Sequence, residues 1–300
     1  MNYKIVIGIV AIAIIAAGIS GYAYLSSPMQ TTVMLNGSGA TFPYPLLDAM
    51  IKQYQEQRTN VQINYQPIGS GGGISALESK TVDFAASDAP LGAVDMAKAP
   101  GSLHIPETIG AVTLAYNLPG IPTGLHLTGE VIADIFAGNV TTWNDTEIQG
   151  LNSNSALPAK SMVVVHRSDG SGTTFIFTGY LSASSFAWQQ AIGQGKSVAW
   201  PAGLGANGNT GVASVVQGTQ YTIGYVELAY ALQNNMTVAA IKNTVGNWIL
   251  PSLNTIQLAV QSAASGGLPA GNGNWTNVNI LNAPDPQAYP IVSFTYLLVY

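Results

Sequence analysis

The residues best suited to chemistry lie in one run, His166 to Thr173, whose sequence is HRSDGSGT. The run contains Arg167, one of only two arginines in the chain. A guanidinium group is a rigid, planar fork of donors that matches the oxygens of a tetrahedral oxyanion. The serine and threonine hydroxyls around it add donors that can rotate toward such a ligand. The run therefore predicts an oxyanion-binding site.

Glycine-rich loops recur along the chain, each between a strand-like segment and a helix-like segment. Three of them occupy residues 36–42, 69–73 and 167–173, and a further turn contains Asp88. In parallel α/β sheets, ligands bind where loops leave the carboxyl ends of strands and helices begin. Free amides at a helix N-terminus suit an anion, and glycine lets the backbone approach it closely. Several such loops together indicate an oxyanion or phosphate ligand.

Motifs for nucleotide binding and catalysis fail on spacing. Gly195-Lys196-Ser197 resembles the end of a P-loop, but Gln190 replaces the upstream glycine that a P-loop requires. Neither Gly37-x-Gly39 nor Gly170-x-Gly172 is followed by the third small residue of a dinucleotide fingerprint. The sequence contains no G-x-S-x-G or H-E-x-x-H motif, and its three histidines are scattered. We therefore expect no catalytic residues, no metal site and no cofactor.

Composition narrows the function classes further. Charged residues make up only 8% of the 300-residue chain, and the net charge is −5. With no basic cluster, the chain has no positive field for nucleic acid, so we expect none to bind. The absence of cysteine excludes disulfides, thiolate metal sites, cysteine nucleophiles and lipid attachment through an N-terminal cysteine. The length suits two lobes better than one compact domain.

The N-terminus carries a targeting signal. Lys4 precedes an uncharged apolar stretch over residues 5–25, long enough to cross a bilayer as a helix. A cleaved signal peptide is the alternative, with small residues around Gly21 and Ala23 as its cleavage site. We favour an uncleaved transmembrane anchor over residues 1–25 and a polar linker over 26–31, because no other tether is available. In either case the rest of the chain is exported and extracytoplasmic.

Strand and helix patterns alternate after the linker. A helix follows the loop at 36–42, with Leu47 and Ile51 on its apolar face and Thr41 as a candidate N-cap. The alternation predicts an α/β protein with mostly parallel sheets. Residues 290–300 form an apolar run typical of a strand in a sheet interior. No segment follows to cover this strand, so we expect the printed sequence to be a fragment of a longer chain.

Seven segments resemble the periplasmic phosphate-binding protein family, the capture component of ABC phosphate importers. They are GSGATFPYP (37–45), IGSGGG (68–73), TVDFAASDAPL (81–91), TTWND (141–145), VVHRSDGSGTTFIFTGYL (164–181), WPAGLGANGN (200–209) and IGYVELAYALQNN (223–235). The resemblance implies a two-lobed periplasmic-binding-protein-like fold with a hinge. Lobe one then comprises 32–111 and the strand 289–300, and lobe two comprises 112–288. The family resemblance also implies that the partners are permease subunits of an importer, and we expect the protein to be a monomer.

The resemblance also implies which residues hold phosphate. The implied ligand groups are Thr41, Phe42, Ser70, Asp88, Arg167, Ser171, Gly172 and Thr173, and Asp169 is implied to pair with Arg167 and orient it. Simpler interpretations stay open at this point. Arg167 and Asp169 could form only a surface ion pair, and Asp88 could be only a helix cap.

Two other function classes compete with phosphate capture. One is a binding protein or sensor for another oxyanion, such as sulfate or molybdate. Asp88 separates this class from phosphate capture, because a fully deprotonated anion has no proton to offer a carboxylate. The other is a secreted phosphatase, which the chain disfavours because it lacks paired metal ligands and any nucleophile–base arrangement.

Overall fold

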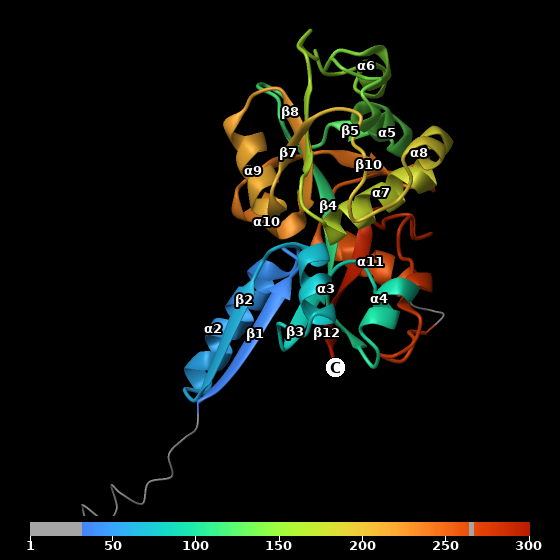
Figure 1. Cartoon of the computed structure of the whole chain (residues 1–300). Helices are drawn as coiled ribbons and strands as arrows, with labels where there is room; N and C mark the ends of the chain where they lie inside the picture. The colour runs from blue at the N-terminus through green and yellow to red at the C-terminus, as the bar shows by residue number, and fades with distance from the viewer. Residues whose placement is uncertain (1–31, 264–266) are drawn as a thin grey trace, which may run out of the picture.

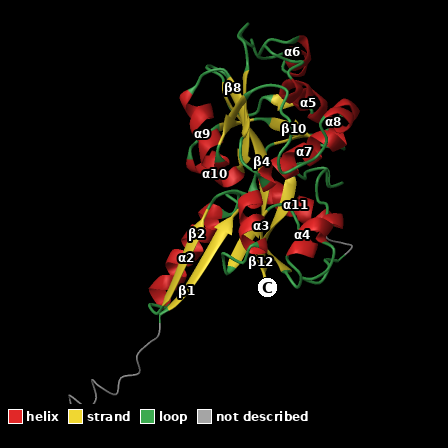
Figure 2. Ribbon diagram, in the orientation of Figure 1, coloured by secondary structure: helices red, strands yellow, loops and turns green. Residues whose placement is uncertain are grey.

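The computed structural model describes residues 32–263 and 267–300, which form two lobes along one long axis (Figure 1). The predicted anchor, residues 1–25, and the linker, 26–31, lie outside the described residues. Strands run through the middle of the second lobe with helices on either side of them (Figure 2). The expected two-lobed α/β architecture is confirmed.

The first lobe contains the N-terminal elements and the last strand of the chain. Its elements are β1 (Val33–Gly39), α2 (Tyr44–Gln57), β2 (Val61–Gln66), α3 (Ser70–Glu78), β3 (Phe84–Ser87), α4 (Ala93–Lys98), the first part of β4 (Leu103–Asn117), and β12 (Val292–Val299). Strand β1 pairs in parallel with β2 and β3. Strand β12 lies between β3 and β4, antiparallel to both, so the expected interior strand at the C-terminal end is confirmed.

The second lobe is built on the other half of β4. Its elements are β5 (His126–Leu127), α5 (Gly129–Ala137), α6 (Thr146–Leu151), β6 (Val163–Arg167), α7 (Gly172–Ser184), α8 (Phe186–Ala191), β7 (Leu204–Ala206), α9 (Gly208–Gly218), β8 (Thr222–Glu227), α10 (Leu228–Gln233), β9 (Thr237–Val238), β10 (Ala240–Lys242) and β11 (Trp248–Ile249). Strand β6 pairs in parallel with β7 and β8. A small separate sheet joins β11, β10 and β5.

One strand joins the two lobes. Within the described residues, nine strands form a single sheet in the order β2-β1-β3-β12-β4-β8-β6-β7, with β9 beside β4. Up to Ala111, β4 pairs with β12; from Val112 onward it pairs with β8. Because β4 is antiparallel to both neighbours, the sheet is mixed rather than mostly parallel. The parallel strands lie on both sides of β12 and β4: β2, β1 and β3 on one side, and β8, β6 and β7 on the other.

The segment after β11 contacts both lobes. It begins with α11 (Leu253–Ala263) and includes the short 3-10 helix η2 (Trp275–Asn277). The Trp275 ring packs edge-on against Tyr296 of β12, with 5.2 Å between ring centroids. Further along, the Pro286 carbonyl accepts a hydrogen bond from Asn243 Nδ2 at 3.0 Å. The segment therefore lies beside the connection between the lobes.

One local expectation for α2 needs correction. Helix α2 begins at Tyr44 after Pro43, and no side chain caps it, so the prediction that Thr41 is its N-cap is wrong. Its apolar face is only partly buried. Leu47 is 7% exposed, whereas Met50 is 55% exposed within the described part of the chain.

Candidate functional site: an anion cradle between the lobes

Arg167 is the last residue of β6, and the fold buries it. Its side chain is only 1% exposed, and its backbone amide donates to the Tyr225 hydroxyl at 3.1 Å. The strand lies between β7 and β8, so the side chain leaves the sheet at the carboxyl ends of parallel strands. This is the edge at which α/β sheets place their ligands.

Asp169 clamps the guanidinium of Arg167. Arg167 Nε donates to Asp169 Oδ1 at 2.7 Å, and Nη2 donates to Oδ2. The amide of Gly208, at the start of α9, donates to the same Oδ1 at 3.1 Å. Burial alone would raise the pKa of Asp169, but the hydrogen bonds and charge of Arg167 outweigh it and lower that pKa. The pair is therefore ionised and rigid, and the arginine is not a loose surface residue.

The first turn of α7 supplies amides and hydroxyls beside this pair. Ser171 is the N-cap of α7, and its Oγ accepts the Thr174 amide at 3.0 Å. Thr173 Oγ1 accepts Arg167 Nη1 at 3.2 Å. All three side chains of this turn that carry hydroxyls are buried within the described structure: Ser171, Thr173 and Thr174. A helix N-terminus with free amides and a neighbouring cation is suited to an anion.

The first lobe presents a second helix N-terminus. Helix α3 begins at Ser70, so the predicted glycine-rich loop is in fact its first turn. Ser70 Oγ accepts the Asp88 amide at 3.2 Å and lies 3.5 Å from Asp88 Oδ2. The Asp88 carboxyl is 1% exposed and accepts the Thr295 hydroxyl of β12 at 3.0 Å. The carboxylate is thus held in place by two elements of its own lobe.

Burial decides the charge of Asp88. Removal from water raises its pKa to about 7, against the opposing effects of the Thr295 hydrogen bond, the Arg167 charge and the Ser70 and Thr173 hydrogen bonds. Glu107, half-buried on β4, shares the Thr295 hydroxyl at 3.4 Å. Burial and the Asp88 charge raise the pKa of Glu107 to about 8. Asp88 therefore changes its protonation state near neutral pH, and its ionised form can accept a hydrogen bond from a ligand.

Thr41 and Phe42 complete the first-lobe side. Both are buried, at 5% and 3% exposure, in the turn between β1 and α2. The Thr41 carbonyl accepts the Tyr230 hydroxyl of α10 at 2.6 Å. The Phe42 ring packs so closely on Gly110 that a side chain there would meet it at 2.4 Å. This packing fixes the turn against β4, where the lobes join.

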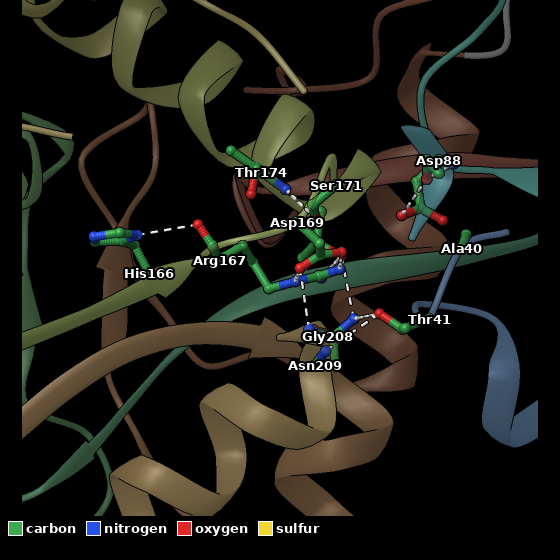
Figure 3. A network of polar contacts seen from close by, with 12 residues as sticks. Ala40, Thr41, Asp88, His166, Arg167, Asp169, Ser171, Thr174, Gly208 and Asn209 are labelled. Carbon is green, nitrogen blue, oxygen red and sulfur yellow. Dashed lines mark hydrogen bonds and ion pairs between the residues drawn. The ribbon is translucent and has the colours of Figure 1, made fainter. Parts of the chain in front are cut away.

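The two lobes touch around these residues. The Gly71 amide of α3 donates to the Gly170 carbonyl at 2.8 Å. Lys196 Nζ lies 3.2 Å from Asp95 Oδ2 across the same boundary. Figure 3 shows Thr41 and Asp88 on one side of the network, with Arg167, Asp169 and Ser171 opposite. Gly172, the first residue of α7, lies so close to Asp88 and Ser70 that a Cβ added there would be 2.5 Å from Asp88 Oδ2 and from Ser70 Oγ. The predicted residues of the two lobes therefore face one another at this boundary, and Phe42 takes part through its packing on β4.

Sequence reasoning missed some members of this cradle. Asn209 is completely buried and contacts both Thr41 and Thr173. Thr295 contacts Asp88 from 207 positions away. Asn209 is the last residue of the segment 200–209, which carries part of the family resemblance. Its place in that segment was the signal that could have identified it as a site residue. Thr295 had none, because a threonine in an apolar strand has no distinctive pattern.

Comparison with known proteins agrees with this geometry. The model of the PBP superfamily domain matches residues 26–300. The phosphate-binding protein PstS of Xylella fastidiosa is 43% identical over 91% of this chain and 74% of its own length. PstS of Pasteurella multocida is 42% identical over 92% of this chain and 78% of its own length. The chain belongs to the phosphate-binding protein PstS family.

A solved structure shares the PstS-family fold. A phosphate-binding protein from Stenotrophomonas maltophilia superposes with a TM-score of 0.61, at 19% identity, over 89% of this chain and 78% of that one. At this identity the likeness shows the fold alone. In residues 32–263 and 267–300, no helix has the length and apolar character needed to cross a membrane. The same residues contain no group of three or more His, Asp or Glu side chains placed to hold a metal ion.

Proposed function

We propose that this chain captures inorganic phosphate outside the cytoplasm and delivers it to the permease of an ABC importer. The observation that carries the proposal is the Arg167–Asp169 clamp, which faces the N-termini of α7 and α3 within a buried cradle. A fixed guanidinium and two sets of free helix amides together stabilise a multivalent anion. The membership in the PstS family supports phosphate as that anion.

The proposed ligand groups come from both lobes. Thr41, Phe42, Ser70 and Asp88 would contact phosphate from lobe one. From lobe two, the contacting residues would be Arg167, Ser171, Gly172 and Thr173, with Asp169 orienting the arginine. Each hydroxyl is a donor for phosphate oxygens, and Asp88 is the acceptor for a phosphate hydroxyl.

The lobes would close around the ligand by rotating about β4 and the segment before β12. Lobe one is taken as 32–111 with 289–300, and lobe two as 112–288. The partner change of β4 at Val112 supports the first boundary. Delivery requires opening, so the closed lobes would present phosphate to a permease that favours the open form.

The remaining proposals concern location and assembly. We infer that residues 5–25 direct export of the protein and stay attached as a membrane anchor. In the alternative, they are a leader that is removed, and the exported protein has no tether. The protein acts as a monomeric binding protein rather than as an enzyme. Sulfate or molybdate capture is the second candidate, and Asp88 argues against it because those anions have no proton to donate to a carboxylate.

Calorimetric titration tests the proposal directly. The protein is titrated with phosphate, sulfate and molybdate at one pH and ionic strength. We expect phosphate to bind in a one-to-one complex and far more tightly than the other two anions. Tighter binding of sulfate or molybdate would identify that anion as the ligand in place of phosphate. The absence of binding heat with all three anions would overturn the proposal.

A further inference from the structure

Asn209 occupies the boundary between the lobes with every polar atom of its side chain in use. It is the second residue of α9 and is completely buried. Its Nδ2 donates to Thr41 Oγ1 at 2.9 Å and to Thr173 Oγ1 at 3.2 Å. Its backbone amide donates to the same Thr41 oxygen at 3.2 Å. One amide therefore links a hydroxyl of lobe one to a hydroxyl of lobe two. Figure 3 shows Asn209 beside Thr41.

The carbonyl end of the Asn209 side chain fixes which way the amide faces. Its Oδ1 accepts the Glu227 amide at 2.9 Å, at the start of α10. If the amide were turned over, its NH2 group would face another N–H donor and its oxygen would face the two threonines. The Glu227 amide therefore holds both Nδ2 hydrogens toward Thr41 and Thr173.

These contacts use up the lone pairs of both threonine hydroxyls. A threonine hydroxyl has two lone pairs to accept hydrogen bonds and one hydrogen to donate. Thr41 Oγ1 accepts twice from Asn209, through the backbone amide and Nδ2. Thr173 Oγ1 accepts from Arg167 Nη1 and from Asn209 Nδ2. Each hydroxyl is left with its hydrogen alone, so each is a committed donor.

We propose that Asn209 is the positioning residue that turns the Thr41 and Thr173 hydroxyls into fixed donors for phosphate and couples phosphate binding to closure of the lobes. The inference rests on the proposed function and deepens it. Asn209 does not itself contact the ligand in this scheme. Both hydrogen bonds that the Thr41 hydroxyl accepts come from Asn209 of lobe two. The hydroxyl therefore becomes a committed donor only when the lobes meet.

Two substitutions separate this role from a purely structural one. Asn209→Leu keeps the size of the side chain but removes both Nδ2 donors, and we expect phosphate affinity to fall about 10- to 100-fold. In Asn209→Asp, the carboxylate accepts the two threonine hydrogens and turns them away from phosphate. It also adds a negative charge beside the anion, so we expect a fall of about 100-fold or more. Asn207→Asp is the matched control, because it adds the same charge on an exposed residue two positions earlier.

The readouts are calorimetric titration with inorganic phosphate, X-ray scattering with and without saturating phosphate, and the melting temperature of the ligand-free protein. We expect weaker binding and a larger radius of gyration at subsaturating phosphate for both Asn209 variants, with Asn207→Asp like the wild type. In a Thr41→Val background, Asn209→Leu should cost less affinity than in the wild type, because one of its two partners is already gone. Thr41→Val also tests the same bonds from lobe one, should a substitution at Asn209 prevent folding.

Several results would overturn the inference while leaving phosphate capture intact. One is wild-type phosphate affinity in Asn209→Leu with only a lower melting temperature, which would make Asn209 structural. Another is full additivity of Asn209→Leu and Thr41→Val. If instead the wild-type protein binds no phosphate, the proposed function itself fails, so the two failures are distinguishable.

Discussion

The replacement of Asp88 by asparagine should weaken the discrimination between phosphate and sulfate. An ionised carboxylate can only accept a hydrogen bond, and phosphate still has a hydroxyl to donate in both its mono- and dibasic forms. Sulfate has none, so it would meet a repelling charge and an acceptor without a donor. In Asp88→Asn the charge is removed and the amide can donate to sulfate. The phosphate-to-sulfate affinity ratio should therefore fall.

The size of the effect follows from the burial of the carboxyl. Asp88 is 1% exposed, so water screens it little. Phosphate can present a neutral hydroxyl to Asp88, whereas sulfate can present only a charged oxygen, and two like unit charges about 4 Å apart repel by about 4 kcal/mol at an effective dielectric constant of about 20. Since about 1.4 kcal/mol corresponds to a tenfold change, the ratio should fall by about 10- to 1000-fold. The lower bound allows for the weaker hydrogen bond that a neutral amide makes with phosphate.

The effect should also depend on pH. Burial raises the pKa of Asp88 to about 7, so in the ligand-free wild type the carboxyl is protonated well below that pH and ionised well above it. A protonated carboxyl can donate to sulfate. The carboxyl should therefore raise the wild-type ratio at about pH 8.5 relative to about pH 5.5. Asp88→Asn should remove this contribution and leave only the pH dependence that comes from phosphate changing between its mono- and dibasic forms.

The assay is titration of both anions into both proteins at the two pH values and constant ionic strength. Asp48→Asn, which removes a partly exposed carboxylate of the same lobe, is the control for net charge. An unchanged ratio in Asp88→Asn at pH 8.5 would make Asp88 a structural residue. A ratio that changes with pH by the same factor in the wild type and in Asp88→Asn would refute the assigned titration.

Three further predictions concern Arg167, Gly172 and the change of melting temperature with pH. Arg167→Lys should weaken phosphate binding by about 1–3 kcal/mol, because lysine cannot satisfy Asp169 and a ligand with one planar fork. Gly172→Ala should weaken binding and keep the lobes apart in X-ray scattering, since the new Cβ would lie 2.5 Å from Asp88 Oδ2. The ligand-free protein should melt at a higher temperature near pH 5 than near pH 8.5. Burial raises the pKa of Asp88 to about 7 and that of Glu227 to about 8, so the folded state holds protons that the unfolded chain releases near pH 4.

Control variants test whether these effects are specific, and each prediction has a result that would contradict it. Arg58→Lys changes the other, exposed arginine and should leave affinity unchanged. Gly218→Ala adds a methyl group at a site with no heavy atom within 4 Å and should leave binding unchanged. Wild-type affinity in Arg167→Lys would exclude a direct contact with phosphate, and wild-type affinity in Gly172→Ala would exclude tight closure at that point. A melting temperature that rises from pH 5 to pH 8.5 would show that the buried carboxyls are not protonated.

The local parts of the site could be predicted from the sequence because their geometry is set within a few residues. Arg167 and Asp169 are two positions apart at the end of a strand, and Ser171 caps the helix that follows. Chain connectivity alone brings the clamp, the cap and the helix amides together. The glycine-rich first turn of α3 was likewise visible, although its glycines proved to be helical. Such short-range features depend on residue type and spacing, which a sequence displays directly.

The tertiary structure alone decided how these parts meet. The bond from Asn209 to Thr41 spans 168 positions, and the bond from Thr295 to Asp88 spans 207. The mixed sheet arises because β4 is shared by both lobes and runs against its neighbours. The raised pKa of Asp88 comes from burial, which depends on the packing of residues distant in the chain. Sequence patterns identified the groups that can hold an anion, whereas the folded chain determined their protonation and the direction of their hydrogen bonds, because both depend on contacts that no local pattern encodes.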